Sequence, residues 1–282
     1  PDVVLTAAHC LDATALTFGF GEVQSARYFI TFAEDLSDLS EGVSTDFPAD
    51  AVEANDWVVH ENFNIQLISG ENVNGPGNFH DVGLIFLSEA IDGVEPELVL
   101  TPEEGESAMV EGTEVVIAGW GQQQQSTGGA FEPPPEGSVG IKRCGPSFIN
   151  EVGSHEFQVG GDASTTRKCH GDSGGPSYVV LDSEHARDRR VIGITSHAYD
   201  AEDCNKGGID TRVDTWFDWL DERMIEACQD GTRSWCEVEG VIPASFYDPP
   251  ADPKRDVDDV GPPPLCRCIS GDSETAPPTF AL

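Results

Sequence analysis

The segment at residues 169–176, Cys-His-Gly-Asp-Ser-Gly-Gly-Pro, constrains the fold most, because a serine flanked by glycines is poor material for the interior of a strand or helix. Glycine permits backbone angles and close approaches that a side chain would block. Such a loop can expose the hydroxyl of Ser173 and direct backbone N–H groups at one point. Acyl transfer needs this combination of a nucleophile and a donor pair. Ser173 is therefore a candidate nucleophile that requires a base and an orienting acid from elsewhere in the chain.

Composition favours a turn-rich β protein. The chain has 282 residues, with 30 glycines and 19 prolines, which is enough for one large all-β domain with additions or for two small domains. Lys and Arg number 15 against 51 Asp and Glu, a net charge of −36. We expect no nucleic-acid partner, because phosphate binding needs concentrated positive charge. The acidity suits a solvated exterior, or saline or calcium-rich surroundings.

The sequence favours a secreted or cell-surface protein. No apolar run approaches the ~20 residues of a membrane helix, and eight cysteines favour an oxidising compartment. The chain begins with proline, and its first residues resemble the interior of a strand. We therefore expect a fragment whose start, including any targeting segment, is lost.

Apolar patterns predict many short strands and one helix. The helix is amphipathic and covers 215–227. Loops are expected at 33–56, 61–79, 92–113 and 122–140, and a calcium site in the acidic loop 33–56 is left open. Strands are expected at 3–8, within 16–32, and at 57–60, 82–87, 114–118, 139–143, 155–159, 176–181, 190–196 and 208–213.

His9 and Asp81 are ambiguous when each is taken alone. His9 ends an apolar strand, where a histidine is ordinarily a satisfied core or turn residue. Asp81 stands at the head of a strongly apolar strand, where a carboxylate is costly unless something pairs with it. Whether they are functional residues depends on their relation to Ser173.

Three motifs occur in the order His, Asp, Ser. They are Thr-Ala-Ala-His-Cys around His9, His-Asp-Val-Gly-Leu-Ile around Asp81 and Gly-Asp-Ser-Gly-Gly-Pro around Ser173. Together they resemble the signatures of the chymotrypsin/trypsin-like serine proteases. Weaker matches are Gly119-Trp120-Gly121, Ser196, Thr211-Arg212-Val213 and the C-terminal helix. The resemblance covers about residues 1–228.

The resemblance implies an all-β fold of two six-stranded antiparallel β-barrels with a C-terminal helix, the first barrel being incomplete in this fragment. The protease domain is expected at 1–228. Within it, about 1–115 would form the N-terminal barrel, 116–214 the C-terminal barrel and 215–227 the helix. Residues 229–282, rich in proline and acids, are expected to be a tail or linker. A link to a surface anchor is left open.

The resemblance also assigns roles. Ser173 would attack the scissile carbonyl, His9 would take and return its proton, and Asp81 would hold the His9 tautomer. The N–H groups of Gly171 and Ser173 would form the oxyanion hole. Asp172 would pair with the amino terminus released by zymogen cleavage. Because that terminus would lie upstream of the fragment, residues 1–282 alone are expected to be poorly active.

The disulfides are predicted only in part. The resemblance pairs Cys169 with Cys204, and Cys228 and Cys236 are close enough in sequence to pair with each other. Partners for Cys10, Cys144, Cys266 and Cys268 are left open. A bond between Cys266 and Cys268, which are separated by a single residue, would be strained.

Specificity is expected to differ from that of trypsin. Arg167 stands at the pocket base, where trypsin-like members carry aspartate. It would repel Lys and Arg and could bind a carboxylate, which predicts cleavage after Asp or Glu. Alternatively, Asp210 or Asp162 neutralises Arg167 and the pocket takes neutral side chains. The resemblance places four residues in the pocket wall: Ser196, His197, Ala198 and Gly208. His197 replaces a family tryptophan and is expected to pack as an aromatic surface.

Two other functions are weighed against a secreted serine endopeptidase. Residues 171–175 also fit the Gly-x-Ser-x-Gly pattern of α/β-hydrolases, for which His185 or His197 would follow the serine, but strand residues follow Pro176 instead of a helix. A catalytically silent homologue, acting as a binding or regulatory module, would usually lose a triad member, and all three are present. We expect a monomer that acts on proteins or peptides and needs no cofactor or metal.

Overall fold

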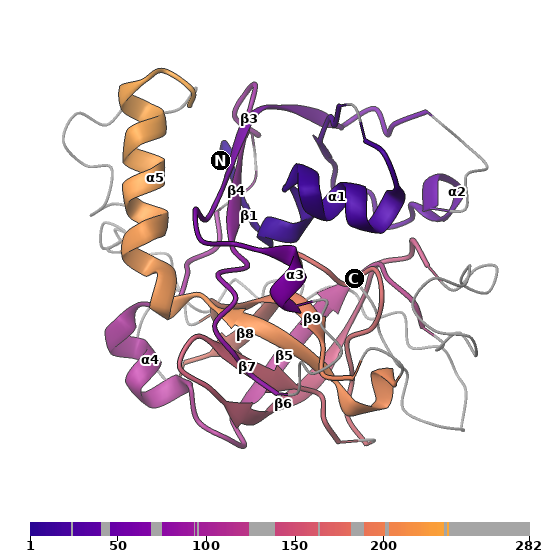
Figure 1. Ribbon diagram of the computed structural model, residues 1–282, viewed down its shortest axis with the longest axis vertical. Helices are drawn as coiled ribbons and strands as arrows, with labels where there is room; N and C mark the ends of the chain where they lie inside the picture. The colour runs from indigo at the N-terminus through magenta and orange to yellow at the C-terminus, as the bar shows by residue number, and fades with distance from the viewer. Residues whose placement is uncertain are drawn as a thin grey trace, which may run out of the picture.

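A computed structural model describes residues 1–233 and Cys236, apart from 24, 41–45, 69–74, 93, 95, 124–138, 163, 182–188 and 201–202. Figure 1 shows a sheet of the first half of the chain above a barrel of the second half, with a long C-terminal helix along one side. Most of the predicted tail at 229–282, with Cys266 and Cys268, lies outside the described residues, as do His185 and most of the loop at 122–140. The predicted domain boundaries remain predictions.

The second half of the chain forms a closed antiparallel barrel with strand order β10-β7-β6-β5-β8-β9. Its core consists of apolar side chains that alternate inward, among them Ile117, Ile149, Phe157 and Ile192. Closing the sheet leaves no edge strand exposed. The strands are β5 (Glu114–Gly119), β6 (Arg143–Val152), β7 (Glu156–Val159), β8 (Pro176–Val180), β9 (Arg189–Ala198) and β10 (Gly208–Arg212).

The first half forms a four-stranded antiparallel sheet of order β1-β4-β3-β2. The strands are β1 (Val3–Thr6), β2 (Phe29–Ile30), β3 (Val52–Val59) and β4 (Gly83–Leu87). Every residue of β4 is buried, as its unbroken apolar sequence predicts. Thr6 of β1 pairs with Gly83 of β4, so the residues just after β1 and just before β4 lie together. This register brings His9 to Asp81.

Short helices connect these strands, namely α1 (Ala13–Phe20), α2 (Ser37–Ser40), α3 (Ile65–Ile68), α4 (Pro102–Ala108) and the 3-10 turns η1 (Ala8–Cys10), η2 (Cys204–Lys206) and η3 (Asp214–Trp216). The long helix α5 (Phe217–Gln229) buries Leu220 and Met224 in a core that also contains Leu84 and Phe86 of β4. The expected C-terminal helix therefore covers the four-stranded sheet. No helix in the described part of the chain is long and apolar enough to span a bilayer.

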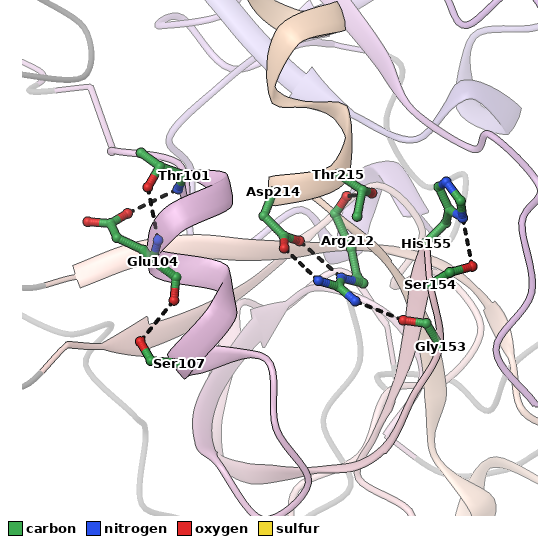
Figure 2. Close-up of polar contacts among 9 residues, drawn as sticks. All are labelled: Thr101, Glu104, Ser107, Gly153, Ser154, His155, Arg212, Asp214 and Thr215. Atoms are coloured by element: carbon green, nitrogen blue, oxygen red, sulfur yellow. Dashed lines mark hydrogen bonds and ion pairs between the residues drawn. The ribbon is translucent and has the colours of Figure 1, made fainter.

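A polar cluster fixes the start of α5 against the barrel (Figure 2). The Arg212 guanidinium donates to Asp214 at 3.1 and 2.6 Å and to the Gly153 carbonyl oxygen at 2.8 Å. The Thr215 hydroxyl donates to the Arg212 carbonyl oxygen at 3.0 Å. The end of β10, the β6–β7 turn and η3 are thus held together, which sets the direction in which α5 leaves the barrel.

The all-β class, the barrel and the C-terminal helix are as predicted, but several local predictions differ. The short helices α2 and α3 lie in the expected loops 33–56 and 61–79. Helix α4 replaces part of the expected loop 92–113; it begins with a capping box in which Thr101 accepts from the Glu104 amide and Glu104 accepts from the Thr101 amide. Residues 13–20 form a helix capped by Asp12, so 16–20 are helical rather than extended. Strand β3 begins at 52, inside an expected loop, and β6 extends to 152 although it contains Gly145 and Pro146, which are unfavourable in strands.

Candidate active site

His9 lies in η1, directly after β1, and two hydrogen bonds hold it on Asp81. Its backbone N–H donates to Asp81 Oδ1 at 2.8 Å, and its ring Nδ1 lies 2.7 Å from Asp81 Oδ2. A carboxylate only accepts, so Nδ1 carries the proton and Nε2 is left as the basic nitrogen. Burial lowers the pKa of His9, but the Asp81 carboxylate and, more weakly, Cys10 together outweigh burial and hold that pKa well above its ordinary value.

Asp81 is fully buried, and both halves of the fold supply its partners. Besides His9, the Ser196 hydroxyl at the end of β9 donates to Asp81 Oδ2 at 2.6 Å. The Thr211 hydroxyl of β10 donates to the Asp81 carbonyl oxygen at 3.0 Å. Burial alone would raise the pKa of Asp81, but His9 and Ser196 hold it below its ordinary value. Asp81 is therefore a buried carboxylate with its charge balanced by donors.

The loop before β8 exposes Ser173 and Gly171 while it buries Asp172. Gly174, at φ +81°, donates from its N–H to the Thr195 carbonyl oxygen at 2.8 Å. A side chain at Gly174 would collide with Thr6, so only glycine fits here. This close approach joins the nucleophile loop to the strand that leads into His9.

Gly171 has φ +91°, which also favours glycine. Among the described residues, neither the Gly171 nor the Ser173 amide donates a hydrogen bond to a protein acceptor. Both residues are exposed. The pair predicted as the oxyanion hole is therefore available to a ligand.

Asp172 is fully buried behind this loop. Its Oδ2 accepts from the Cys169 amide at 2.6 Å, and its Oδ1 has no hydrogen-bond partner among the described residues. Burial raises the pKa of Asp172 well above its ordinary value. A buried carboxyl with an unsatisfied oxygen would be stabilised by a cationic partner.

A pocket of about 250 Å³ is lined by two of the three predicted triad residues and by residues predicted to bind substrate. His9 and Ser173 lie in its wall with the predicted residues Ser196, His197, Ala198 and Gly208. Five residues that the sequence did not assign to the site also contribute. They are Ile65 and Ile68 of α3, Lys168, His170 and Thr195. Ile65 and Ile68 were missed because α3 lies in a stretch expected to be loop, whereas His170 lies within the 169–176 segment itself.

The positive charge of the pocket is not where the sequence placed it. Lys168 lines the pocket, and Arg167 is not among the lining residues. The Lys168 ammonium lies 2.7 Å from Asp210 Oδ2, and both side chains are at most 2 % exposed. Asp210 therefore neutralises Lys168 rather than Arg167. The charge of Arg167 acts on Asp162, whose pKa is lowered by Ser164 and, more weakly, by Arg167.

His197 packs as an aromatic surface, as expected. Its ring meets the Phe79 ring edge to face at 5.5 Å between centroids. Burial lowers the pKa of His197 to about 4, so the ring is neutral at physiological pH. Its Nδ1 lies 3.1 Å from the Ser196 hydroxyl, which in turn holds Asp81.

Two predicted disulfides are present. Cys169 is bonded to Cys204, which ties the nucleophile loop to η2 beside the pocket. Cys228 is bonded to Cys236 just beyond α5. Among the described residues, no group of three or more His, Cys, Asp or Glu side chains is arranged to hold a metal ion. The calcium site left open within 33–56 stays a prediction, and residues 41–45 of that loop are not described.

Comparison with known proteins agrees with this geometry. The family model described as trypsin matches residues 1–220. The clotting factor G beta subunit of Tachypleus tridentatus is 25% identical over 240 residues, which cover 78% of this chain and 67% of that protein. Trypsin of Sus scrofa is 27% identical over 180 residues, covering 62% and 71%. Chymotrypsin-C of Bos taurus is 26% identical over 232 residues, covering 79% and 75%. Since the family model spans well over half of the chain, the protein belongs to the trypsin-like family of serine proteases.

Proposed function

We propose that this protein is a serine endopeptidase that hydrolyses peptide bonds through Ser173, His9 and Asp81. The observation that carries the proposal is the paired contact of His9 with buried Asp81, at 2.8 and 2.7 Å, in the wall of a pocket that also contains exposed Ser173. A binding module would not need a tautomer fixed so firmly beside an exposed hydroxyl.

In the proposed mechanism, His9 Nε2 takes the Ser173 proton as the hydroxyl attacks the scissile carbonyl carbon. Asp81 stabilises the imidazolium that forms. The amides of Gly171 and Ser173 donate to the developing oxyanion, a contribution that typically amounts to about 10²–10³ in rate per donor. His9 then protonates the leaving amine, and water hydrolyses the acyl-enzyme by the same steps in reverse.

The role of Asp172 is also a proposal. Its buried, unsatisfied Oδ1 supports pairing with a cation, for which the amino terminus formed on zymogen activation is the expected partner. Such a bond would fix the loop that carries Gly171 and Ser173. Loss of Ser173 reactivity in Asp172→Asn, with retained folding, would support this role.

Secretion or display at the cell surface fits the two disulfides, since such bonds persist in oxidising compartments. The expected substrates are proteins or peptides. Because aspartate is absent from the pocket-base position and Lys168 is neutralised there, we infer that cleavage after Lys or Arg is disfavoured. Cleavage after Asp or Glu depended on Arg167, which does not line the pocket.

The test is covalent labelling of the full-length, activated protein with a fluorophosphonate probe. Labelling is expected at Ser173, and it should be lost in Ser173→Ala and strongly slowed in His9→Ala. Turnover of a mixed peptide library should follow the same order. A folded protein that neither labels nor cleaves would instead be the silent homologue, a binding or regulatory module.

A further inference from the structure

Lys168 in the pocket wall forms a buried ion pair with Asp210, and the bonds of this pair are satisfied internally. The Lys168 ammonium donates to Asp210 Oδ1 at 2.8 Å, to Asp210 Oδ2 at 2.7 Å and to the Thr195 hydroxyl at 2.7 Å. An ammonium has three N–H donors, so none remains for a substrate. The Ser177 hydroxyl donates to Asp210 Oδ2 at 2.6 Å, which further satisfies the carboxylate.

On the pocket side, the pair presents Lys168 rather than Asp210. Lys168 lines the pocket, while Asp210 is fully buried and is not among the lining residues. The Lys168 stem lies directly against Gly208: a methyl group at Gly208 would meet Lys168 Cβ at 3.0 Å and Cδ at 3.5 Å. A substrate side chain that enters therefore meets methylene groups, with both charges behind them.

We propose that Lys168 and Asp210 together make this pocket selective for peptides with an uncharged side chain at the residue before the scissile bond. This inference rests on the proposed endopeptidase function. A basic side chain would meet an ammonium already held by its own counter-ion, and an acidic one would find no free donor. Either would be desolvated without a partner, which is costly, whereas an uncharged side chain gains from the apolar stem.

The pair also makes the selectivity reversible by one substitution. In Asp210→Asn the Lys168 amine loses its counter-ion, so an entering Asp or Glu side chain can replace Asp210 as the partner that stabilises its charge, and the pocket should admit Asp or Glu. In Lys168→Met the Asp210 carboxylate remains without its cation, so cleavage after Lys or Arg should become faster relative to cleavage after uncharged residues. The double variant Lys168→Met with Asp210→Asn again has no net charge at these two positions and should return to uncharged residues.

The experiment measures kcat/KM of the full-length, activated protein on peptides that differ only at the residue before the scissile bond. The kcat/KM for peptides with an uncharged residue at this position should exceed that for peptides with Asp or Glu, and that for peptides with Lys or Arg, by about 100-fold. Asp210→Asn and Lys168→Met should each raise one charged class at least about tenfold relative to uncharged residues, in opposite directions. Arg27→Gln removes a cation of an exposed pair with Glu53 and should leave the profile unchanged.

Fluorophosphonate labelling of Ser173 in each variant distinguishes the possible failures. No labelling and no turnover in the unaltered protein would overturn the proposed function and this inference with it. Normal labelling with a preference for Lys, Arg, Asp or Glu would overturn the inference alone. If a single variant does not fold and therefore does not label, the unaltered protein and the double variant still decide, because both must prefer uncharged residues.

Discussion

Replacing Glu156 with glutamine should make the protein more stable at pH 8 while it leaves stability at pH 5 nearly unchanged. Glu156 begins β7 and is 1 % exposed. Its Oε2 accepts from the Gly77 amide at 2.6 Å, while Oε1 has no partner among the described residues. Burial raises the pKa of Glu156 from 4.5 to about 8; the Gly77 amide opposes this shift, and the charges of Asp81 and Asp210 add to it.

Stability falls as the pH rises because Glu156 releases its proton on unfolding. Between pH 4.5 and 8 the folded protein keeps Glu156 protonated, whereas the unfolded chain ionises it. Raising the pH therefore favours the unfolded state, by about 1.4 kcal/mol per pH unit in this window. From pH 5 to pH 8 the loss amounts to about 3.5 kcal/mol, less than three times this slope because Glu156 titrates partly at both ends of the range. Glutamine is neutral throughout and retains an acceptor for Gly77, so it removes this loss.

The assay is urea denaturation from pH 5 to pH 8 in a Ser173→Ala background, which prevents self-cleavage. The quantity compared is the difference in unfolding free energy between Glu156→Gln and the parent at each pH. Glu151→Gln is the matched control, because Glu151 is an exposed glutamate on the neighbouring strand β6. A difference for Glu156→Gln that stays constant over this range would refute the reasoning.

Three further predictions concern the site. Asp81→Asn should lower kcat by about 10⁴ and move the acid limb of kcat/KM to lower pH, because Asp81 is what raises the pKa of His9; a pH–rate profile measures both. Replacing Cys169 and Cys204 together with alanine should lower the unfolding free energy by about 3 kcal/mol in urea, and an unchanged midpoint would contradict a stabilising role. Gly174→Ala should slow Ser173 labelling about tenfold or more, since the methyl group collides with β1 and φ is +81°.

Sequence reasoning succeeded where local chemistry left few alternatives. The glycines around Ser173 admit a loop and little else, and β4 is continuously apolar because it is buried along its whole length. Helix α4 was missed although its signature is local: Thr101, Pro102 and Glu104 form a capping box with proline in the first turn. Most of strand β6, beyond the strand expected at 139–143, was missed for a different reason. Its pairing with β5 overrides the unfavourable residues Gly145 and Pro146.

Other features depend on contacts between residues far apart in the chain. Ser196 and Thr211 complete the surroundings of Asp81 from 115 and 130 residues away. The apolar wall formed by Ile65 and Ile68 arises only because α3 folds over the pocket. Glu156 has its raised pKa because the folded barrel buries it near Asp81 and Asp210. No pattern within a short window encodes such distances.

The sequence by itself determined the family, the order of His9, Asp81 and Ser173, and the loop that exposes the nucleophile, because each depends on residue types within a few positions. Only the tertiary structure decided which cation lines the pocket. Arg167 and Lys168 are adjacent in sequence, and either could have occupied the pocket. Strand β10 places Asp210 within 2.7 Å of Lys168, and a buried ammonium is stable only beside such a counter-ion. The folded barrel therefore brings Lys168, and not Arg167, to the pocket with its charge balanced by Asp210.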